Sequence, residues 1–315
     1  MKKNKRSRGL ELIIAYLLDA LIGDPEIYPH PVRIIGRSID YLQPRLRMGD
    51  RDAVAAGGLL AATVVGGTYG ITRLLVAVAP GFADTALLYT AIARKDLERS
   101  ALRVAEALEE NDLASAREGL KALAGRDVDK MDNIAICRAA VESVAENFVD
   151  GVLAPMLWGA TAGAPGAMAF KAVSTLDSMI GHDDETHRYI GKLSARLDDL
   201  AVFPSARIAL PLIVAASAIL RLDAAAALKI GLRDRKNHPS PNSAHAEASF
   251  AGALGLTLGG PSDYGGLRRD LPEIGEGTSE VEPRHIREAV RLLNIASLLA
   301  LSVAVLLSGR GGRWK

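Results

Sequence analysis

Long apolar runs without charged residues constrain this chain more than any other feature of its sequence. Residues 53–72, 151–170 and 292–309 contain no Asp, Glu, Lys or Arg. A helix that crosses a bilayer needs about 20 predominantly apolar residues, and several uncharged runs of this length are difficult to bury in one soluble core. The sequence therefore predicts membrane-spanning helices. Residues 74–93 form a further candidate, which Pro80 and Gly81 interrupt and which carries Asp84. Residues 208–220 are a weaker candidate, which an extension back past Arg207 would lengthen. Residues 10–22 are short and carry Glu11 and Asp19, so they are expected to be interfacial or half-inserted.

The composition supports the same class of protein. Hydrophobic residues make up 49% of the chain and aromatic residues only 4%, with a surplus of the small residues that let helices pack closely in a bilayer. No alternating strand pattern of useful length occurs. We predict an all-α fold, a polytopic helical integral membrane protein with amphipathic helical connecting segments, organised as a single domain over residues 1–315. The net charge of +1 gives no argument for nucleic acid, and Cys137, the only cysteine, excludes a disulfide framework.

Basic residues flank the first and last apolar runs and predict the orientation of the chain. Because Lys and Arg concentrate on the cytoplasmic side of membrane proteins, we expect both termini to be cytoplasmic in a multi-pass protein of the cell membrane. These residues are Lys2, Lys3, Lys5, Arg6 and Arg8 at one end and Arg310, Arg313 and Lys315 at the other.

Four polar blocks alternate with the apolar runs, at residues 23–52, 94–150, 171–200 and 221–290. The second block predicts amphipathic helices. The first helix has an apolar stripe of Leu97, Ala101, Val104 and Leu108. The second follows a cap at Asn111 or Asp112 and has the stripe Leu113, Ala116, Leu120 and Leu123. The third begins at Ile134 and has Val141, Val144 and Phe148 on its apolar side.

The first block holds His30 and Arg33 within a proline-rich turn that begins at Gly23 and Asp24. Prolines restrict the backbone, so the turn is suited to hold these side chains in fixed positions. An arginine fork suits a phosphate or carboxylate. A purely structural turn after a helix is the alternative explanation.

The second block ends in a stripe of charges at spacings of four: Arg138, Glu142, Glu146 and Asp150. On a helix this spacing places one cation and three acids along a single face. A solvated Arg138–Glu142 ion pair is the ordinary explanation of such a stripe. The stripe runs directly into an apolar segment, however, and clustered carboxylates near a membrane surface are suited to Mg²⁺ that is shared with nucleotide phosphates.

The third and fourth blocks add further acids, cations and rigid loops. The third contains Lys171, Asp177, Arg196, Asp198 and Asp199. The fourth contains the segment Asn237-His238-Pro239-Ser240-Pro241-Asn242 and two glycine pairs around Tyr264, which are typical of a rigid loop whose backbone approaches a ligand closely.

Together these clusters resemble the adenosylcobinamide-phosphate synthase family of cobalamin biosynthesis, the CobD/CbiB proteins. The matching segments are GDPEIYPHPVRIIG at 23–36, RAAVESVAENFVDGVLAP at 138–155, STLDSMIGH at 174–182, ARLDDL at 195–200, HPSPNS at 238–243 and LGGPSDYGG at 258–266. This chain departs from the family pattern at Ser174, where the family usually has Asn, and at Ala244-His245-Ala246, where the family usually has Gly-Trp-Pro.

The resemblance implies ATP-dependent amide formation between a carboxylate of adenosylcobyric acid and aminopropanol or its phosphate. The expected cofactors are ATP and Mg²⁺. The expected partners are the corrinoid substrate, the amine and membrane lipid, and other corrinoid-pathway enzymes are further candidates. No nucleic-acid partner is expected. The candidate residues are as follows: catalytic, His30, Arg33, Glu146, Asp150, Asp177 and His238; substrate- or phosphate-binding, Asp24, Lys171, Arg196, Asn242 and Tyr264; metal-binding, Glu142, Glu146, Asp150, Asp198 and Asp199. A polytopic transporter and a corrinoid-binding membrane scaffold are the alternatives.

Because ATP is cytoplasmic, the four polar clusters are expected to meet on that side of the membrane. A single crossing by residues 151–170 would separate Glu146 from Asp177. This run is interrupted by Pro155, Gly159, Gly163, Pro165 and Gly166, so we predict a re-entrant hairpin or a strongly kinked pair of helices there. Two legs joined at Pro80-Gly81 are predicted for residues 53–93.

Overall fold

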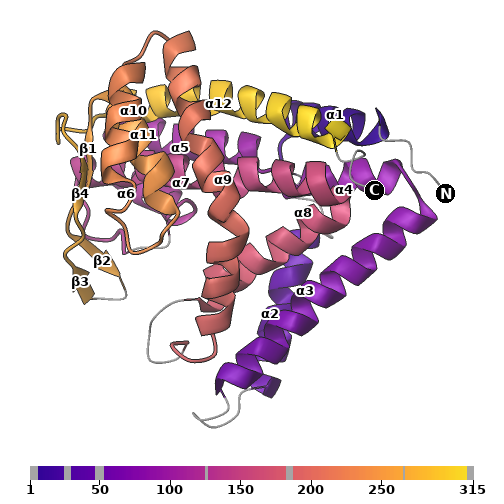
Figure 1. Ribbon diagram of the computed structural model, residues 1–315. Coiled ribbons are helices and arrows are strands. Elements are labelled where there is room, and N and C mark those ends of the chain that lie inside the picture. The colour runs from indigo at the N-terminus through magenta and orange to yellow at the C-terminus, as the bar shows by residue number, and fades with distance from the viewer. Residues whose placement is uncertain are drawn as a thin grey trace. The chain divides into compact units, whose positions relative to one another are not determined.

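A computed structural model describes residues 6–24, 30–46, 53–124, 127–181, 187–264 and 267–310 (Figure 1). The helices are α1 (Arg6–Ile22), α2 (Pro31–Leu46), α3 (Ala53–Val78), α4 (Phe82–Ala91), α5 (Arg94–Glu109), α6 (Leu113–Lys121), α7 (Asn133–Asn147), a π-helix η1 (Phe148–Leu153), α8 (Ala154–Ile180), α9 (Lys192–Ile219), α10 (Ala224–Asp234), α11 (Ser243–Leu254) and α12 (Pro283–Arg310). The strands are β1 (Thr257–Gly259), β2 (Ser262–Tyr264), β3 (Leu267–Arg269) and β4 (Glu273–Gly275).

The chain forms two compact units. Unit 1 comprises Met1–Ala93, Val152–Val202 and Leu301–Lys315, and unit 2 comprises Arg94–Gly151 and Phe203–Ala300. Helices dominate both, as the sequence predicts. The exception is in unit 2, where β1 pairs with β4 and β2 pairs with β3, both antiparallel. Each of these strands has three residues, which is too short for a recognisable alternation of apolar and polar side chains.

Three of the described helices are long and apolar enough to cross a membrane: Ala53–Val78, Lys192–Ile219 and Pro283–Gly309. They coincide with the predicted runs 53–72, 208–220 and 292–309. Large apolar side chains on them are exposed, including Leu74 at 64%, Val78 at 77% and Leu306 at 67%. Because contiguous exposed apolar surface is costly in water, these helices indicate association with a membrane.

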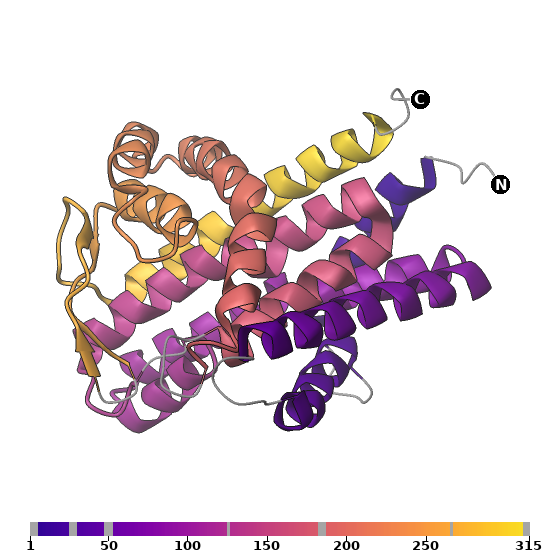
Figure 2. The same cartoon turned by 60° about the horizontal axis from the view of Figure 1, so that its bottom comes forward.

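The apolar run 151–170 does not form one straight helix. Within α8, Gly163 has φ 75° and ψ −172°, a conformation outside any helix. A Cβ placed on Gly159 would lie 3.9 Å from the Cβ of Ala167, although eight residues of straight helix span about 12 Å. The chain therefore reverses at Gly163, and α8 runs out and folds back on itself (Figures 1 and 2). The predicted kinked pair of helices is confirmed.

Arg8 of α1 stabilises this reversal. Its Nη1 donates a hydrogen bond of 3.0 Å to the carbonyl oxygen of Thr161, at the end of the outgoing half of α8. The last carbonyls of a helix lack partners in their own helix, and a cation there also interacts favourably with the helix dipole. A Cβ on Gly159 would lie 2.6 Å from Leu88 of α4 and 3.3 Å from Leu12 of α1, so small residues allow these helices to pack closely.

The break at Pro80-Gly81 also joins two helices, as predicted. α3 ends at Val78 and α4 begins at Phe82, and the two helices contact each other. Gly81 has φ +82°, and its N–H donates to Asp84 Oδ2 at 3.1 Å. α1, which the sequence suggested was interfacial or half-inserted, packs against α4 and α8 and buries both of its acids, Glu11 and Asp19.

Unit 2 has a helical core in which α5 packs against α6 and α7, and α11 packs against α7 and α10. The predicted apolar stripes face this core, since Leu97, Val104, Leu120, Val144 and Phe148 are buried. Asp112 caps α6 and Asp132 caps α7, each accepting a backbone N–H from the first turn. Local sequence therefore determines where these helices begin, and their apolar faces determine how they pack.

Candidate functional site

The acidic face of α7 contacts the fourth polar block within unit 2. The N–H of Gly259 donates to Glu142 Oε1 at 2.7 Å, and the hydroxyl of Ser243 donates to Glu146 Oε1 at 2.8 Å. Glu142 is buried, whereas Glu146 and Asp150 are half-buried. Two predicted clusters, far apart in the sequence, are therefore brought together around these carboxylates.

The charge stripe is not an ion pair of the kind that commonly explains i,i+4 charges. Arg138 makes a long hydrogen bond of 3.4 Å to the carbonyl oxygen of Ser279. Arg138 has no ion pair with any carboxylate whose side chain the structure describes, and its Nε is buried without a hydrogen-bond partner. Arg138 was recognised as part of the stripe but was not among the predicted site residues.

Asp150 lies in η1, the π-helix that follows α7. π-Helical turns are rare and are often found at functional sites. In a sequence, such a turn has no distinctive pattern, so the simple spacing of four does not describe the helix beyond Asn147.

The predicted metal ligands do not form one preformed cluster within a unit. Glu142, Glu146 and Asp150 belong to unit 2, and Asp198 and Asp199 belong to unit 1. Over the described part of the chain, no group of three or more His, Cys, Asp or Glu side chains is arranged to hold a metal ion. Mg²⁺ commonly takes only one or two carboxylates together with substrate phosphates, so metal binding by Glu146 and Asp150 stays a prediction.

The segment from His238 to Asn242 is ordered by its own polar side chains. The N–H of Ser240 donates to His238 Nδ1 at 3.0 Å, and the N–H of Asn242 donates to Ser240 Oγ at 3.3 Å. Since Nδ1 accepts a hydrogen bond, a neutral His238 carries its proton on Nε2 and presents a donor. Asn242 Oδ1 accepts a hydrogen bond of 2.5 Å from Arg207 Nη1 of α9.

Arg207 was not predicted as a site residue. A charged residue within an apolar run is a signal of function, because charges in such runs are costly. Arg207 is such a residue, and it contacts the predicted substrate loop through Asn242 and Pro241.

His245 occupies the departure from the family pattern and is buried in α11. Burial, together with the nearby positive charges of Arg207 and Arg235, lowers its pKa to about 4. Its Nδ1 is buried without a hydrogen-bond partner. A neutral imidazole at this position is unsuited to act as a general acid at neutral pH.

The first and third polar blocks meet in unit 1. Helix α2 packs against α8, and a Cβ on Gly36 would lie 3.6 Å from Met179 Sδ. His30 precedes α2 and is buried, with its Nε2 2.7 Å from Asp24 Oδ1. Arg33 is exposed on the first turn of α2.

The remaining predicted residues of unit 1 lie on α8 and on the first part of α9. Lys171 and Asp177 are half-buried on α8, and Arg196 is exposed on α9, followed by the half-buried Asp198 and Asp199. The side chain of Tyr264, in β2 of unit 2, lies outside the described part of the structure. Convergence of all four polar blocks stays a prediction.

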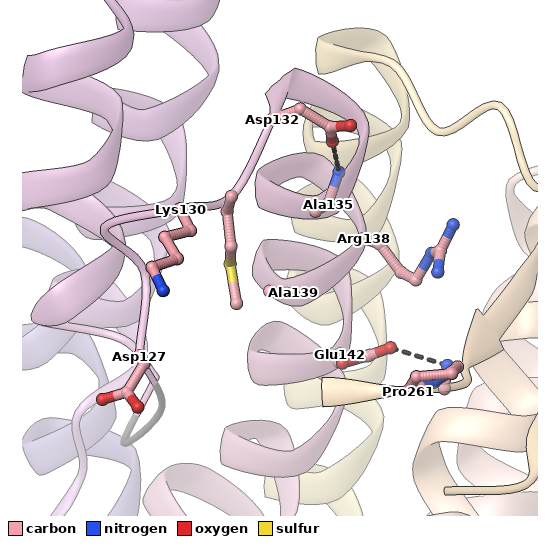
Figure 3. A pocket seen from close by; sticks show the side chains of 10 residues that line it. Asp127, Lys130, Asp132, Ala135, Arg138, Ala139, Glu142 and Pro261 are labelled. Atoms are coloured by element: carbon pink, nitrogen blue, oxygen red, sulfur yellow. Dashed lines mark hydrogen bonds between the residues drawn. The ribbon is translucent and has the colours of Figure 1, made fainter. Parts of the chain in front are cut away.

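A small polar pocket of about 190 Å³ opens in unit 2 beside the first turns of α7. Figure 3 shows Arg138 and Glu142 projecting from α7 toward the segment that holds Pro261. The lining residues are Asp127, Lys130, Met131, Asp132, Ala135, Arg138, Ala139, Glu142, Gly259 and Pro261.

These features define a largely helical protein, with polar clusters between its apolar segments and, among the residues that the structure describes, three helices suited to cross a membrane. A family model described as CobD/Cbib protein matches residues 12–293, and the chain belongs to this family. The resemblance inferred from the motifs is therefore confirmed.

Curated relatives match the chain over nearly its full length. It is 44% identical over 302 residues to the cobalamin biosynthesis protein CbiB of Salmonella choleraesuis, covering 93% of this chain and 95% of the relative. It is 43% identical over 302 residues to the cobalamin biosynthesis protein CobD of Klebsiella pneumoniae, with the same coverage. The CobD protein of Pelobacter propionicus is 43% identical over 309 residues, covering 95% of this chain and 96% of the relative. No solved structure matches the chain.

Proposed function

We propose that this protein is an ATP-dependent ligase of cobalamin biosynthesis, which joins aminopropanol or its phosphate to a carboxylate of adenosylcobyric acid. Family membership supports the pathway, and the relatives' names refer to cobalamin biosynthesis. The observation that carries the chemistry is the hydrogen bond to Glu146 of α7 from Ser243, the residue that follows the His238–Asn242 segment and begins α11.

The reaction requires activation of the carboxylate before the amine attacks. A free carboxylate has a poor leaving group, and phosphoryl transfer from ATP gives an acyl phosphate whose leaving group is good. Cations stabilise the charge that develops on the phosphates, and we assign this role to Arg33, Lys171 and Arg196. Mg²⁺ would supply further charge neutralisation at Glu146 and Asp150.

The attacking amine must be neutral, so a base has to remove its proton. His30 suits this role better than His238. Asp24 Oδ1 lies 2.7 Å from His30 Nε2, although the contact does not have hydrogen-bond geometry, and we assign the proton-accepting role to Nδ1, the other ring nitrogen. In His238 the Nδ1 lone pair already accepts a backbone hydrogen bond.

Product formation by the purified protein tests the proposal. We expect amide product only when ATP, Mg²⁺, adenosylcobyric acid and the amine are all present. Glu146→Gln and Asp150→Asn should abolish the product while membrane yield stays normal, and Glu110→Gln, an exposed acid of the same unit, should retain activity. A corrinoid-binding scaffold would bind corrinoid without consuming ATP, and a transporter would form no amide product. Normal turnover of both site variants across a Mg²⁺ titration would contradict the assigned roles.

A further inference from the structure

The pocket beside α7 is small compared with the two large substrates of the proposed reaction, ATP and the corrinoid. Pockets for drug-sized ligands occupy roughly 300–1,000 Å³. A volume of about 190 Å³ therefore suits a molecule smaller than a whole nucleotide or a corrinoid ring.

The pocket is lined by both acidic and basic side chains. The acids described below accept hydrogen bonds within the protein, whereas the cations form no ion pair with a described carboxylate. The carboxylate of Asp132 accepts the N–H of Ala135 at 2.8 Å, and that of Glu142 accepts the N–H of Gly259 at 2.7 Å. The two cations, Lys130 and Arg138, have no ion pair with any described carboxylate. The cations lack a counter-charge and therefore suit the phosphate of a small ligand. The carboxylates lie beside them and suit an ammonium group on the same ligand.

Arg138 is the group best placed to bind the phosphate. Among the described residues, Nε of Arg138 is buried without a hydrogen-bond partner and the hydrogen bond to Ser279 is long, so the guanidinium retains donors for a ligand. A planar guanidinium binds phosphate through two parallel hydrogen bonds. A buried donor that stays unpaired is costly, and a bound oxyanion would relieve this cost.

The glycine pair opposite Arg138 keeps this space open. Gly259 has φ +73° and Gly260 has φ +82°, conformations that L side chains rarely adopt. A Cβ on Gly260 would lie 3.8 Å from Arg138 Nη1, so the bare backbone faces the guanidinium. The hydrogen bond from Gly259 to Glu142 fixes this turn against α7.

The pocket is also close to the carboxylates proposed for chemistry. Glu142 lines it, and Glu146 is one helical turn further along α7, about 6 Å along the helix axis. We propose that this pocket is the subsite for the amine substrate in its phosphorylated form, with Arg138 binding the phosphate. This inference rests on the proposed function and assigns its smallest substrate to named residues.

Binding measurements separate the pocket from the reaction, because they need neither ATP nor corrinoid. Isothermal titration of the detergent-solubilised protein with aminopropanol phosphate, aminopropanol and inorganic phosphate is the assay. We expect Arg138→Gln to weaken binding of aminopropanol phosphate about 10- to 100-fold and to leave the weak binding of aminopropanol unchanged. Arg138→Lys should give an intermediate loss, because an ammonium keeps the charge without the fork.

Arg103→Gln is the matched control, since Arg103 is an exposed cation of α5 in the same unit, and it should bind both amines as the wild type does. Unchanged binding of aminopropanol phosphate by Arg138→Gln would overturn the proposal, as would equal loss of both amines. If the wild type binds aminopropanol phosphate through Arg138 but forms no amide, the proposed reaction fails and the subsite stands. If the wild type forms the amide and Arg138→Gln has unchanged kcat/KM, the subsite fails and the reaction stands.

Discussion

Replacing Gly163 with alanine perturbs the reversal of α8 at one backbone position. Gly163 has φ 75° and ψ −172°, a region that glycine alone occupies readily. An added Cβ would lie 3.6 Å from Pro165 Cδ and 3.6 Å from Arg8 Nε, which are ordinary van der Waals contacts. The cost of Gly163→Ala is therefore backbone strain and not a steric clash.

That strain sets the expected magnitude. Residues held in sparsely populated backbone regions cost about 1–3 kcal/mol each, so Gly163→Ala should lower the free energy of unfolding by this amount. Arg8 and the packing of Leu12 and Leu88 over Gly159 hold the reversal in place, and local relaxation cannot remove the strain without losing those contacts.

Gly70→Ala is the matched control because Gly70 lies inside α3 and a Cβ there would meet nothing within 4 Å. Alanine in a regular helix is favoured over glycine by about 0.5–1 kcal/mol, so this variant should be slightly more stable than the wild type. Unfolding in detergent micelles, followed by circular dichroism against denaturant, measures both. The reasoning is refuted if Gly163→Ala is as stable as the wild type, or if both substitutions change stability in the same direction.

The other predictions concern Glu142, His245 and Cys137. Glu142→Gln keeps an acceptor for the N–H of Gly259, so its free energy of unfolding should lie within about 1 kcal/mol of the wild-type value. Glu142→Ala removes the acceptor and should lower the free energy of unfolding by about 1–3 kcal/mol. Denaturant unfolding measures both, and equal losses would contradict this role of Glu142. The pKa of His245 is lowered to about 4, below its unfolded value near 6.5, so the unfolded chain binds this proton more readily and stability should fall as pH decreases from about 6.5 to about 4. Thermal unfolding across this range should show a smaller fall for His245→Gln, and identical pH profiles would count against the assignment. Cys137 is buried, and burial raises the pKa of its thiol to about 12. Maleimide should therefore label the denatured but not the native protein at neutral pH. Rapid labelling of the native protein, detected by mass spectrometry, would show instead that the thiol is accessible.

Features that depend on local sequence were predicted well. Apolar runs identified α3 and parts of α9 and α12, and the predicted cap at Asp112 marked the start of α6. The two reversals were predicted because Pro80-Gly81 and the glycines around Gly163 interrupt otherwise apolar segments. Each of these signals acts within a few residues, so it is readable from the sequence alone.

Features that depend on distant contacts were not predictable. Neither the pairing of Glu142 with the backbone of Gly259 nor that of Glu146 with Ser243 has a local signal, because the partners are about a hundred residues apart. The spacing of four in the charge stripe suggested an Arg138–Glu142 pair as the ordinary explanation, but the buried carboxylate of Glu142 instead accepts the part-buried backbone N–H of Gly259. Arg138 therefore forms no ion pair with Glu142, which is the basis for proposing it as a ligand-binding residue.

The two acids of α7 consequently differ in what they are free to do. Glu142 is buried and accepts a hydrogen bond from a backbone N–H, which has no alternative position, so moving this carboxylate onto a metal or substrate would strand the donor of Gly259. Glu146 is half-buried and accepts from the hydroxyl of Ser243, which can rotate toward another acceptor at little cost. Glu146 is therefore the better candidate for Mg²⁺ or proton transfer, and Glu142 the better candidate for holding the glycine turn against Arg138. If this division is correct, Glu146→Gln loses turnover at unchanged stability, whereas Glu142→Gln retains both.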